Sequence, residues 1–373
     1  MAGIYVHIPF CKQACHYCDF HFSTNVSQLE EMMKMIAKEA ILRKEYLGKE
    51  TIETIYFGGG TPSLPDPKWI DFLLNEFSKI YSLDLKEVTL EANPDDLNAE
   101  NLHSWKEIGI DRLSLGIQSF DDRILQFYNR AHNSKESLEA IGKARDAGFF
   151  KFSMDLIYGF PWENHDIWKK DLELVFAQNP GHISCYALTV EPKTALGVWE
   201  KKGKFSPANE DFVAEQFEIL QEEAEKYGYD QYEISNFSIP GKEAFHNTNY
   251  WKSIPYLGLG PGAHSFDGKQ RGSNIRNNIK YIQSLQSDHI SFEKEDIEES
   301  DILNEYILTS LRTRWGIDLN YLNRRFGKDL KQEKRNQLDQ FDQAGWLLWG
   351  ENTLSLSKSG KLLADSIASA LFY

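Results

Sequence analysis

The chain has 373 residues, of which 41% are hydrophobic and 26% charged, a composition typical of a globular protein with a sizeable core. Its formal net charge of −15 at pH 7 argues against nucleic acid as a partner and leaves at most a peripheral membrane contact. No apolar run approaches about 18 residues, and the first residues lack the basic flank of a secretion signal, so we expect a cytoplasmic protein.

Short β-branched runs alternate with longer amphipathic stretches through the first half of the chain. The predicted strands are Ile4–Ile8, Thr54–Phe57, Val88–Glu91, Arg112–Ile117, Phe152–Ile157 and Ile183–Leu188. The predicted helices are Gln28–Tyr46, Lys68–Ile80, Ala99–Ile108, Ser134–Ala147 and His165–Gln178. This alternation indicates an α/β fold with βα units around a parallel sheet. Six units predict a partial, open (β/α)6 barrel, with a doubly wound sheet as the alternative.

The pattern changes in the last third of the chain. A helical stretch near Asn209–Tyr227 precedes a Gly-rich, aromatic segment from His246 to Phe266. Beyond it we expect helices and two short apolar stretches, at Ile297–Arg314, Leu319–Phe326, Lys331–Ala344, Trp346–Trp349, Leu354–Leu356 and Lys358–Leu371. This order predicts a barrel domain over residues 1–290 and a small, mainly helical, winged-helix-like domain over 291–373. Such folds often bind DNA, but no basic stripe is present, so packing or partner docking is favoured.

Three cysteines follow the first predicted strand with the spacing C-x3-C-x2-C, at Cys11, Cys15 and Cys18. Three thiolates on one short loop can hold three irons of a 4Fe–4S cluster and leave the fourth open to a small molecule, as in radical S-adenosylmethionine (SAM) chemistry. The alternative is a zinc site completed by His16 or His21. Zinc motifs usually contain a second, distant pair of ligands, however, and the only other cysteine is Cys185.

Polar and Gly-rich residues concentrate just after the predicted strands. They are Gly58-Gly59-Gly60-Thr61-Pro62, Glu91, Gln118-Ser119, Asp155 and Tyr158-Gly159-Phe160-Pro161. The carboxyl ends of the strands form the active face of α/β barrels. Taken singly, the glycines fit a tight turn and Glu91 fits a helix cap, but those explanations account less well for the whole set.

Several of these motifs together resemble the radical-SAM family of oxygen-independent coproporphyrinogen III dehydrogenase, HemN. Within it the best match is the branch of heme chaperones called HemW. The resemblance rests on the cysteine loop and on Tyr5-Val6-His7-Ile8-Pro9-Phe10-Cys11, Gly58-Gly59-Gly60-Thr61-Pro62, Arg112-Leu113-Ser114-Leu115-Gly116-Ile117-Gln118-Ser119 and Asp155-Leu156-Ile157-Tyr158-Gly159-Phe160-Pro161. It covers essentially the whole chain, whereas the cysteine spacing alone would indicate only radical SAM.

The resemblance implies two sets of cofactor ligands. The cluster would be held by Cys11, Cys15 and Cys18. The residues that it assigns to SAM are Tyr5, Tyr17, Gly59, Gly60, Thr61, Glu91, Gln118, Arg130, Asp155 and Ala187. Without the resemblance, Arg130 would be taken as a surface charge and Ala187 as a core residue.

Two departures separate the chain from HemN enzymes. Those enzymes carry a further cysteine two residues after the third ligand, where this chain has Phe20. They also carry a longer N-terminal extension, whereas only ten residues precede Cys11 here. Because that extension helps to form the substrate site in the family, both departures argue against decarboxylation of coproporphyrinogen.

The run His246-Asn247-Thr248-Asn249-Tyr250-Trp251 resembles the HNxxY motif of heme chaperones. A neutral imidazole is a common axial ligand of heme iron, and an aromatic ring can stack on the macrocycle. Asn247 is expected to orient His246 by hydrogen bonding. On the residues alone, a loop-capping histidine with two core aromatics is the more ordinary explanation, and the resemblance favours heme binding by His246, Asn247 and Tyr250.

We therefore expect a heme chaperone that delivers heme to apo-hemoproteins and carries a 4Fe–4S cluster and SAM. Slow SAM cleavage is compatible with this function. The alternative is a radical-SAM enzyme acting on a porphyrinogen propionate, and a zinc-stabilised binding module is a third hypothesis. A homodimer fits the resemblance, although no heptad pattern demonstrates one.

Overall fold

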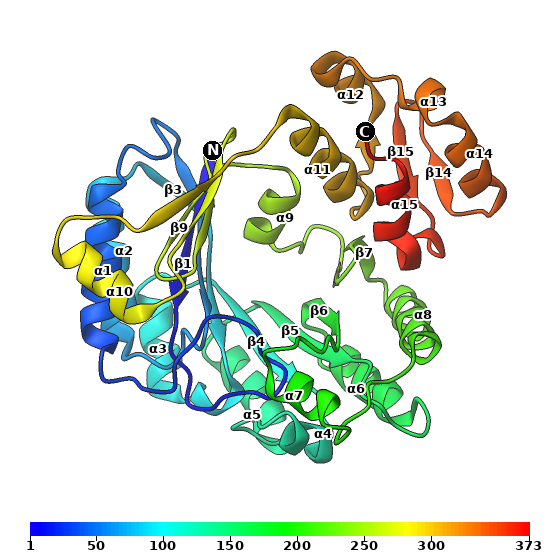
Figure 1. Ribbon diagram of the computed structural model, residues 1–373. Coiled ribbons are helices and arrows are strands. Elements are labelled where there is room, and N and C mark those ends of the chain that lie inside the picture. Colours follow the sequence, from blue (N-terminus) through cyan, green and yellow to red (C-terminus); the bar gives the residue numbers. More distant parts are fainter. The chain divides into compact units, whose positions relative to one another are not determined.

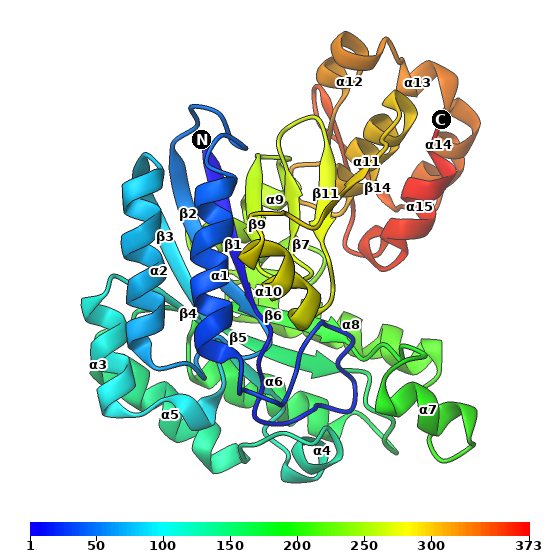
Figure 2. The ribbon, with the colours of Figure 1, turned by 60° about the vertical axis from the view of Figure 1, so that its left-hand side comes forward.

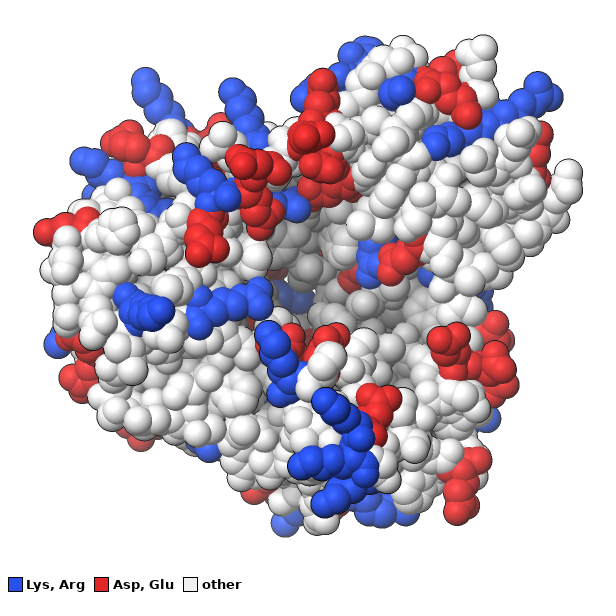
Figure 3. Space-filling model, in the orientation of Figure 1, with Lys and Arg blue, Asp and Glu red and all other residues white.

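The structure is a computed structural model that describes residues 1–373, and it divides into two compact units (Figure 1). The first unit comprises Met1–Gln216 and Ala244–Glu295, and the second comprises Phe217–Glu243 and Asp296–Tyr373. No helix is both long enough and apolar enough to cross a membrane. Acidic and basic side chains are interspersed over the face seen in Figure 3, with a group of basic side chains toward its lower edge.

Six parallel strands form the centre of the first unit, in the order of the sequence. They are β1 (Ala2–Ile8), β2 (Ile52–Gly59), β3 (Leu83–Ala92), β4 (Arg112–Gln118), β5 (Lys151–Tyr158) and β6 (Gly181–Ala187). Each strand pairs in parallel with the next. The order never reverses along these strands, as it would at the switch point of a doubly wound sheet. The predicted partial barrel is therefore confirmed.

A helical segment follows each of the first five strands. These are α1 (Leu29–Leu42), α2 (Pro67–Ile80), α3 (Ala99–Glu107), the pair α4 (Asp122–Phe127) and α5 (Ser134–Asp146), and α6 (Asp166–Ala177). Figures 1 and 2 place α1, α2, α3 and α5 on the outer face of the sheet. Local signals fix their starts: Asp66 caps α2 by accepting from the Lys68 N–H, with Pro67 in the first turn.

The sheet continues beyond β1 into strands that the sequence pattern did not predict. β9 (Tyr256–Leu259) pairs in parallel with β1, and antiparallel β10 (His264–Phe266), β11 (Arg271–Asn274) and β12 (Phe292–Glu295) follow. The same region contains α9 (Phe245–Trp251) and α10 (Asn278–Gln286), and α7 (Ala195–Lys201) follows β6. Strands of three or four residues are too short for a clear period of two, which is why these were missed.

The second unit begins with the later part of α8 (Glu210–Lys226) and the hairpin of β7 (Asp230–Glu233) and β8 (Asn236–Ser238). Its remaining helices are α11 (Glu299–Leu311), α12 (Leu319–Phe326), α13 (Leu330–Glu333), α14 (Arg335–Gln343) and α15 (Ala364–Ala370). A three-stranded antiparallel sheet joins β13 (Ile317–Asp318), β15 (Thr353–Leu356) and β14 (Leu347–Trp349). Helices packed on a small sheet confirm the predicted mainly helical, winged-helix-like domain.

The end of the chain departs from the single predicted helix at Lys358–Leu371. It forms a 3-10 turn over Gly360–Leu363 and then α15. Gly360 lies against the Trp346 backbone so closely that a Cβ would come within 2.2 Å of the carbonyl oxygen. This close approach needs a glycine and sets the tight turn before the helix.

Candidate functional site

The cysteine loop leaves β1 and is fixed to the ends of the next strands. Lys12 Nζ donates to Asp95 Oδ2 at 2.7 Å and also contacts Asp96, both in the turn after β3. His16 Nδ1 lies 2.6 Å from the carbonyl oxygen of Phe127, at the end of α4. The loop therefore lies at the carboxyl ends of the strands, as expected for the active face of a barrel.

The three loop cysteines are free and partly exposed, whereas Cys185 is buried in β6. Burial raises the pKa of Cys11 to about 11 and that of Cys18 to about 12, so both thiols are protonated in the metal-free protein at neutral pH. No three His, Cys, Asp or Glu side chains converge on one ion position. Three thiols on one short loop suit ligands to three irons of a single cluster.

The glycine turn after β2 is hydrogen-bonded to the residues at the start of the cysteine loop. Gly60 N–H donates to the Ile8 carbonyl at 2.9 Å, and Thr61 N–H donates to the Phe10 carbonyl at 2.7 Å. A Cβ on Gly60 would lie 2.7 Å from the Phe10 oxygen, and Gly59 has a φ of +109°. Only glycine fits both positions without strain. The predicted contact of this turn with SAM remains a prediction.

Glu91, near the end of β3, is a buried carboxyl held by two donors. The Tyr56 hydroxyl donates to Oε1 at 2.8 Å, and the Gly59 N–H donates to Oε2 at 3.2 Å. Burial raises the pKa of Glu91 to about 7, and the nearby charge of Asp155 acts in the same direction. The carboxyl is therefore poised to gain or lose its proton near neutral pH.

Arg130 connects the cysteine loop to β3 and β4. Its Nη2 donates to Asn93 Oδ1 at 2.6 Å and to the Gly116 carbonyl at 2.8 Å, and its Nη1 lies 3.5 Å from Cys15 Sγ. Asn93 also donates to Thr61 Oγ1 at 3.3 Å. Asn93 was not among the predicted site residues, although its place two residues after Glu91 at a strand end could have indicated it.

Two polar atoms at this site are buried without a partner. Asp155 Oδ2 accepts from the Ser114 hydroxyl at 2.8 Å, but Oδ1 accepts from no group, and Arg130 Nε donates to none. A buried polar atom without a partner typically costs about 1–3 kcal/mol. One acceptor and one charged donor, left open beside the cysteine loop and strand ends, suit a ligand rich in amino, carboxylate and hydroxyl groups. The residues present therefore fit SAM.

The remaining predicted SAM residues lie on the same strands or loop. Tyr5 is on β1, with its hydroxyl 3.1 Å from His7 Nδ1, and Tyr17 packs edge-on against Tyr128 at 5.0 Å. Gln118 ends β4 with a φ of 67°, and Ala187 ends β6. Burial raises the pKa of both Tyr5 and Tyr17, so their hydroxyls remain neutral.

His246 and Tyr250 lie together on α9, as their i, i+4 spacing requires. His246 Nε2 is 2.8 Å from the Tyr250 hydroxyl, and its Nδ1 is 2.8 Å from Thr54 Oγ1 on β2. The ring is buried, stacks on Tyr56 at 5.1 Å and is neutral, because burial lowers the pKa of His246 to about 3. Both ring nitrogens therefore have protein partners. The orienting role of Asn247 remains a prediction.

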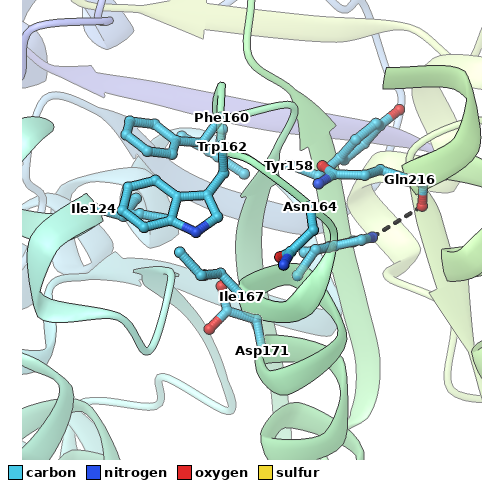
Figure 4. Close-up of a pocket in the computed structure, with 10 residues that line it drawn as sticks. Ile124, Tyr158, Phe160, Trp162, Asn164, Ile167, Asp171 and Gln216 are labelled. Carbon is cyan, nitrogen blue, oxygen red and sulfur yellow. Dashed lines mark hydrogen bonds between the residues drawn. The ribbon is translucent and has the colours of Figure 1, made fainter. Parts of the chain in front are cut away.

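A separate pocket lies where α6 faces the turn after β5 (Figure 4). Aromatic side chains, Phe160 and Trp162 among them, line one part of it. Its carboxylate, Asp171, accepts from the Ser119 hydroxyl and the Phe120 N–H, both at 2.7 Å. Both oxygens are satisfied, so the geometry assigns Asp171 to holding the turn after β4.

The protonation of Glu91 leads to a prediction for the cluster-free, SAM-free protein. Its pKa is raised in the folded chain, so folding favours the protonated form and the stabilisation is lost as pH rises from about 4.5 to about 7. The free energy of unfolding of the wild type should fall by roughly 3 kcal/mol over this range. Glu91→Gln should not show this fall, because its side chain does not titrate. Urea unfolding at several pH values measures it, with exposed Glu139→Gln as control. Identical pH profiles for Glu91→Gln and the wild type would contradict the burial argument.

Comparison with known proteins agrees with this geometry. Residues 5–175 match the family model of the Radical SAM superfamily, and residues 297–363 match that of the HemN C-terminal domain. The chain is 32% identical to "Heme chaperone HemW" of Bacillus subtilis over 99% of both chains. It is 30% identical to the protein of the same name from Haemophilus influenzae, over 98% of this chain and 96% of that one.

A solved structure shares the fold. The coproporphyrinogen III oxidase HemN of Escherichia coli superposes with a TM-score of 0.85 at 19% identity, covering 100% of this chain and 90% of that one. The radical-SAM family implies a 4Fe–4S cluster and SAM, which the cysteine loop and the strand-end residues fit. The 30–32% identity to heme chaperones extends over nearly the whole chain. The chain therefore belongs to the HemW family of radical-SAM proteins.

Proposed function

We propose that this protein is a cytoplasmic heme chaperone that binds heme and passes it to apo-hemoproteins. It carries a 4Fe–4S cluster and SAM and has no coproporphyrinogen oxidase activity. The observation that carries the proposal is the identity of 32% to a protein named as a heme chaperone, which extends over 99% of both chains and so includes both units. Phe20, in place of a fourth cysteine, supports the absence of oxidase activity.

The cysteine loop would bind the cluster, and residues near the strand ends would bind SAM. Cys11, Cys15 and Cys18 would ligate the cluster, which when bound supplies an electron for reductive chemistry on SAM. Arg130 would turn its free Nε toward a SAM carboxylate, since a guanidinium is a permanently charged donor. Asp155 would accept a hydrogen bond at Oδ1, which satisfies an atom that is otherwise buried at a cost.

In this structure both ring nitrogens of His246 on α9 are occupied by protein hydrogen-bond partners. His246 is a neutral imidazole, the form that binds heme iron, but its Nε2 is engaged with Tyr250. Binding of iron at Nε2 requires that hydrogen bond to open, which costs about 0.5–1.5 kcal/mol. We infer that the hydrogen bond between His246 and Tyr250 breaks when His246 binds heme.

An anaerobic hemin titration of the cluster-loaded protein tests the proposal through the Soret absorbance. We expect saturation at about one hemin per chain, and transfer to an added apo-globin. His246→Ala should weaken binding about tenfold or more, since an axial ligand is lost. Exposed His103→Ala, on α3, is the matched control. Absence of saturable binding by the wild type would overturn the chaperone proposal.

A radical-SAM enzyme that acts on porphyrinogen propionates is the alternative. Every residue type expected for SAM binding is present, and Asp155 Oδ1 and Arg130 Nε are buried without a protein partner. Both atoms are therefore available to SAM, which this function requires. Anaerobic incubation of the reduced, cluster-loaded protein with SAM and coproporphyrinogen III separates the two functions. Formation of protoporphyrinogen would support the enzyme and contradict the stated absence of oxidase activity, whereas SAM cleavage without it is compatible with the chaperone.

A further inference from the structure

A second group of polar and apolar side chains lies just after the third cysteine. Its members are Phe20 and His21 on the cysteine loop, His264 on β10, Arg276 just before α10, and Ile279 in the first turn of α10. None of them is assigned to the cluster or to SAM. Unlike His246, which is only 2% exposed, Phe20 is 72% exposed and Ile279 is 56% exposed.

Hydrogen bonds and close packing bring these residues together. His21 Nε2 lies 2.7 Å from Asn278 Oδ1, which joins the cysteine loop to the start of α10. A Cβ placed on Gly262 would lie 3.2 Å from Arg276 Cγ and 3.4 Å from His21 Cβ, so these two side chains flank the same glycine. Gly262 has a φ of +80°, and the absence of a side chain leaves that space open.

The imidazole of His264 is exposed and carries a lone pair that faces a guanidinium. Arg276 Nη2 lies 3.3 Å from His264 Nε2, and since arginine can only donate, Nε2 is the unprotonated nitrogen. Partial burial and the charge of Arg276 lower the pKa of His264, whereas Glu295 on β12 acts in the opposite direction. The exposed imidazole is therefore neutral, as required of a ligand to heme iron.

Two exposed apolar residues are sequence neighbours of the residues that join the cysteine loop to α10. Phe20 immediately precedes His21, and Ile279 immediately follows Asn278, the two residues that form this contact. Exposed large apolar side chains beside cations mark binding surfaces for amphipathic ligands. A metalloporphyrin has a broad apolar face, an iron that accepts an imidazole, and two carboxylates.

We infer that this surface, formed by Phe20, His21, His264, Arg276 and Ile279, is the place where the porphyrin first binds. Phe20 would pack on the macrocycle, His264 Nε2 would face the iron, and Arg276 would turn from the imidazole to a propionate carboxylate. The inference rests on the proposed heme function and names where heme is received before any opening at His246. It also places the porphyrin beside the loop that carries the cluster ligands.

Two probes separate the roles of these side chains: hemin and metal-free protoporphyrin IX, each mixed rapidly with the full, cluster-loaded chain so that the rate of first binding is measured. Arg276→Gln should slow the uptake of both probes about fivefold, because both carry the propionates. His264→Ala should slow hemin uptake by a similar factor, with little effect on the metal-free probe. Phe20→Ser should slow both. The control is Arg335→Gln, an exposed arginine on α14.

The outcomes distinguish this inference from the proposed function. If the wild type binds hemin and all three variants take it up at rates within about twofold of the wild type, the surface assignment is wrong and the chaperone function stands. If the wild type binds neither probe, both fail. Circular dichroism of each variant checks folding, and because all three side chains are on the surface or on a loop, we expect unchanged spectra.

Discussion

Replacement of Cys15 with alanine is expected to remove the iron–sulfur cluster. Cys15 lies between the other two ligands on a loop that is fixed at Lys12 and His16, so no other thiol can take its place. We expect iron and sulfide to fall from about four each per chain in the reconstituted wild type to near zero. Anaerobic purification, iron and sulfide analysis, and electron paramagnetic resonance of the reduced protein measure this.

Cys185 provides the matched control, because it is a cysteine of the same chain that lies buried in β6. Cys185→Ala should keep its iron and sulfide and lose only some stability, since it removes a small buried side chain. Full iron and sulfide content in Cys15→Ala would contradict the ligand assignment. Zinc without sulfide in the wild type would support the zinc-stabilised module instead.

The six parallel strands could be predicted because each is a short run with apolar residues at every second position. In β1 these are Ile4, Val6 and Ile8, which are all fully buried. The polar residues near the strand ends were visible because they lie in or just after these runs. Glu91 and Asp155 were found in this way.

Other parts of the site depend on contacts between distant segments and were not predictable from local pattern. The role of Ser114 depends on its hydrogen bond to Asp155, which is 41 residues away in the sequence. The burial of His246 depends on Thr54, which is 192 residues away in the sequence. Local periodicity carries no information on such pairs, because it reports only which face of an element is apolar.

Arg43 forms a buried ion pair that ties α1 to the added strands of the sheet. Its Nη1 donates to Glu39 Oε1 at 3.0 Å, and both side chains are almost fully buried. Arg43 Nη2 donates to Ser265 Oγ at 3.1 Å, and the Gly260 N–H donates to Glu39 Oε2 at 3.0 Å. The pair therefore holds β9 and β10, on either side of Gly260, against α1.

Arg43→Ala is expected to lower the free energy of unfolding by about 3–5 kcal/mol, because it leaves the Glu39 carboxylate buried without its cation. Urea denaturation of the cluster-free protein measures the loss. The double variant Glu39→Gln/Arg43→Ala should regain part of it, since the stranded charge is gone. Arg123→Ala removes the exposed pair with Asp121 and should cost no more than about 1 kcal/mol. If Arg43→Ala cost as little as Arg123→Ala, the buried pair would not be what holds β9 and β10 to α1.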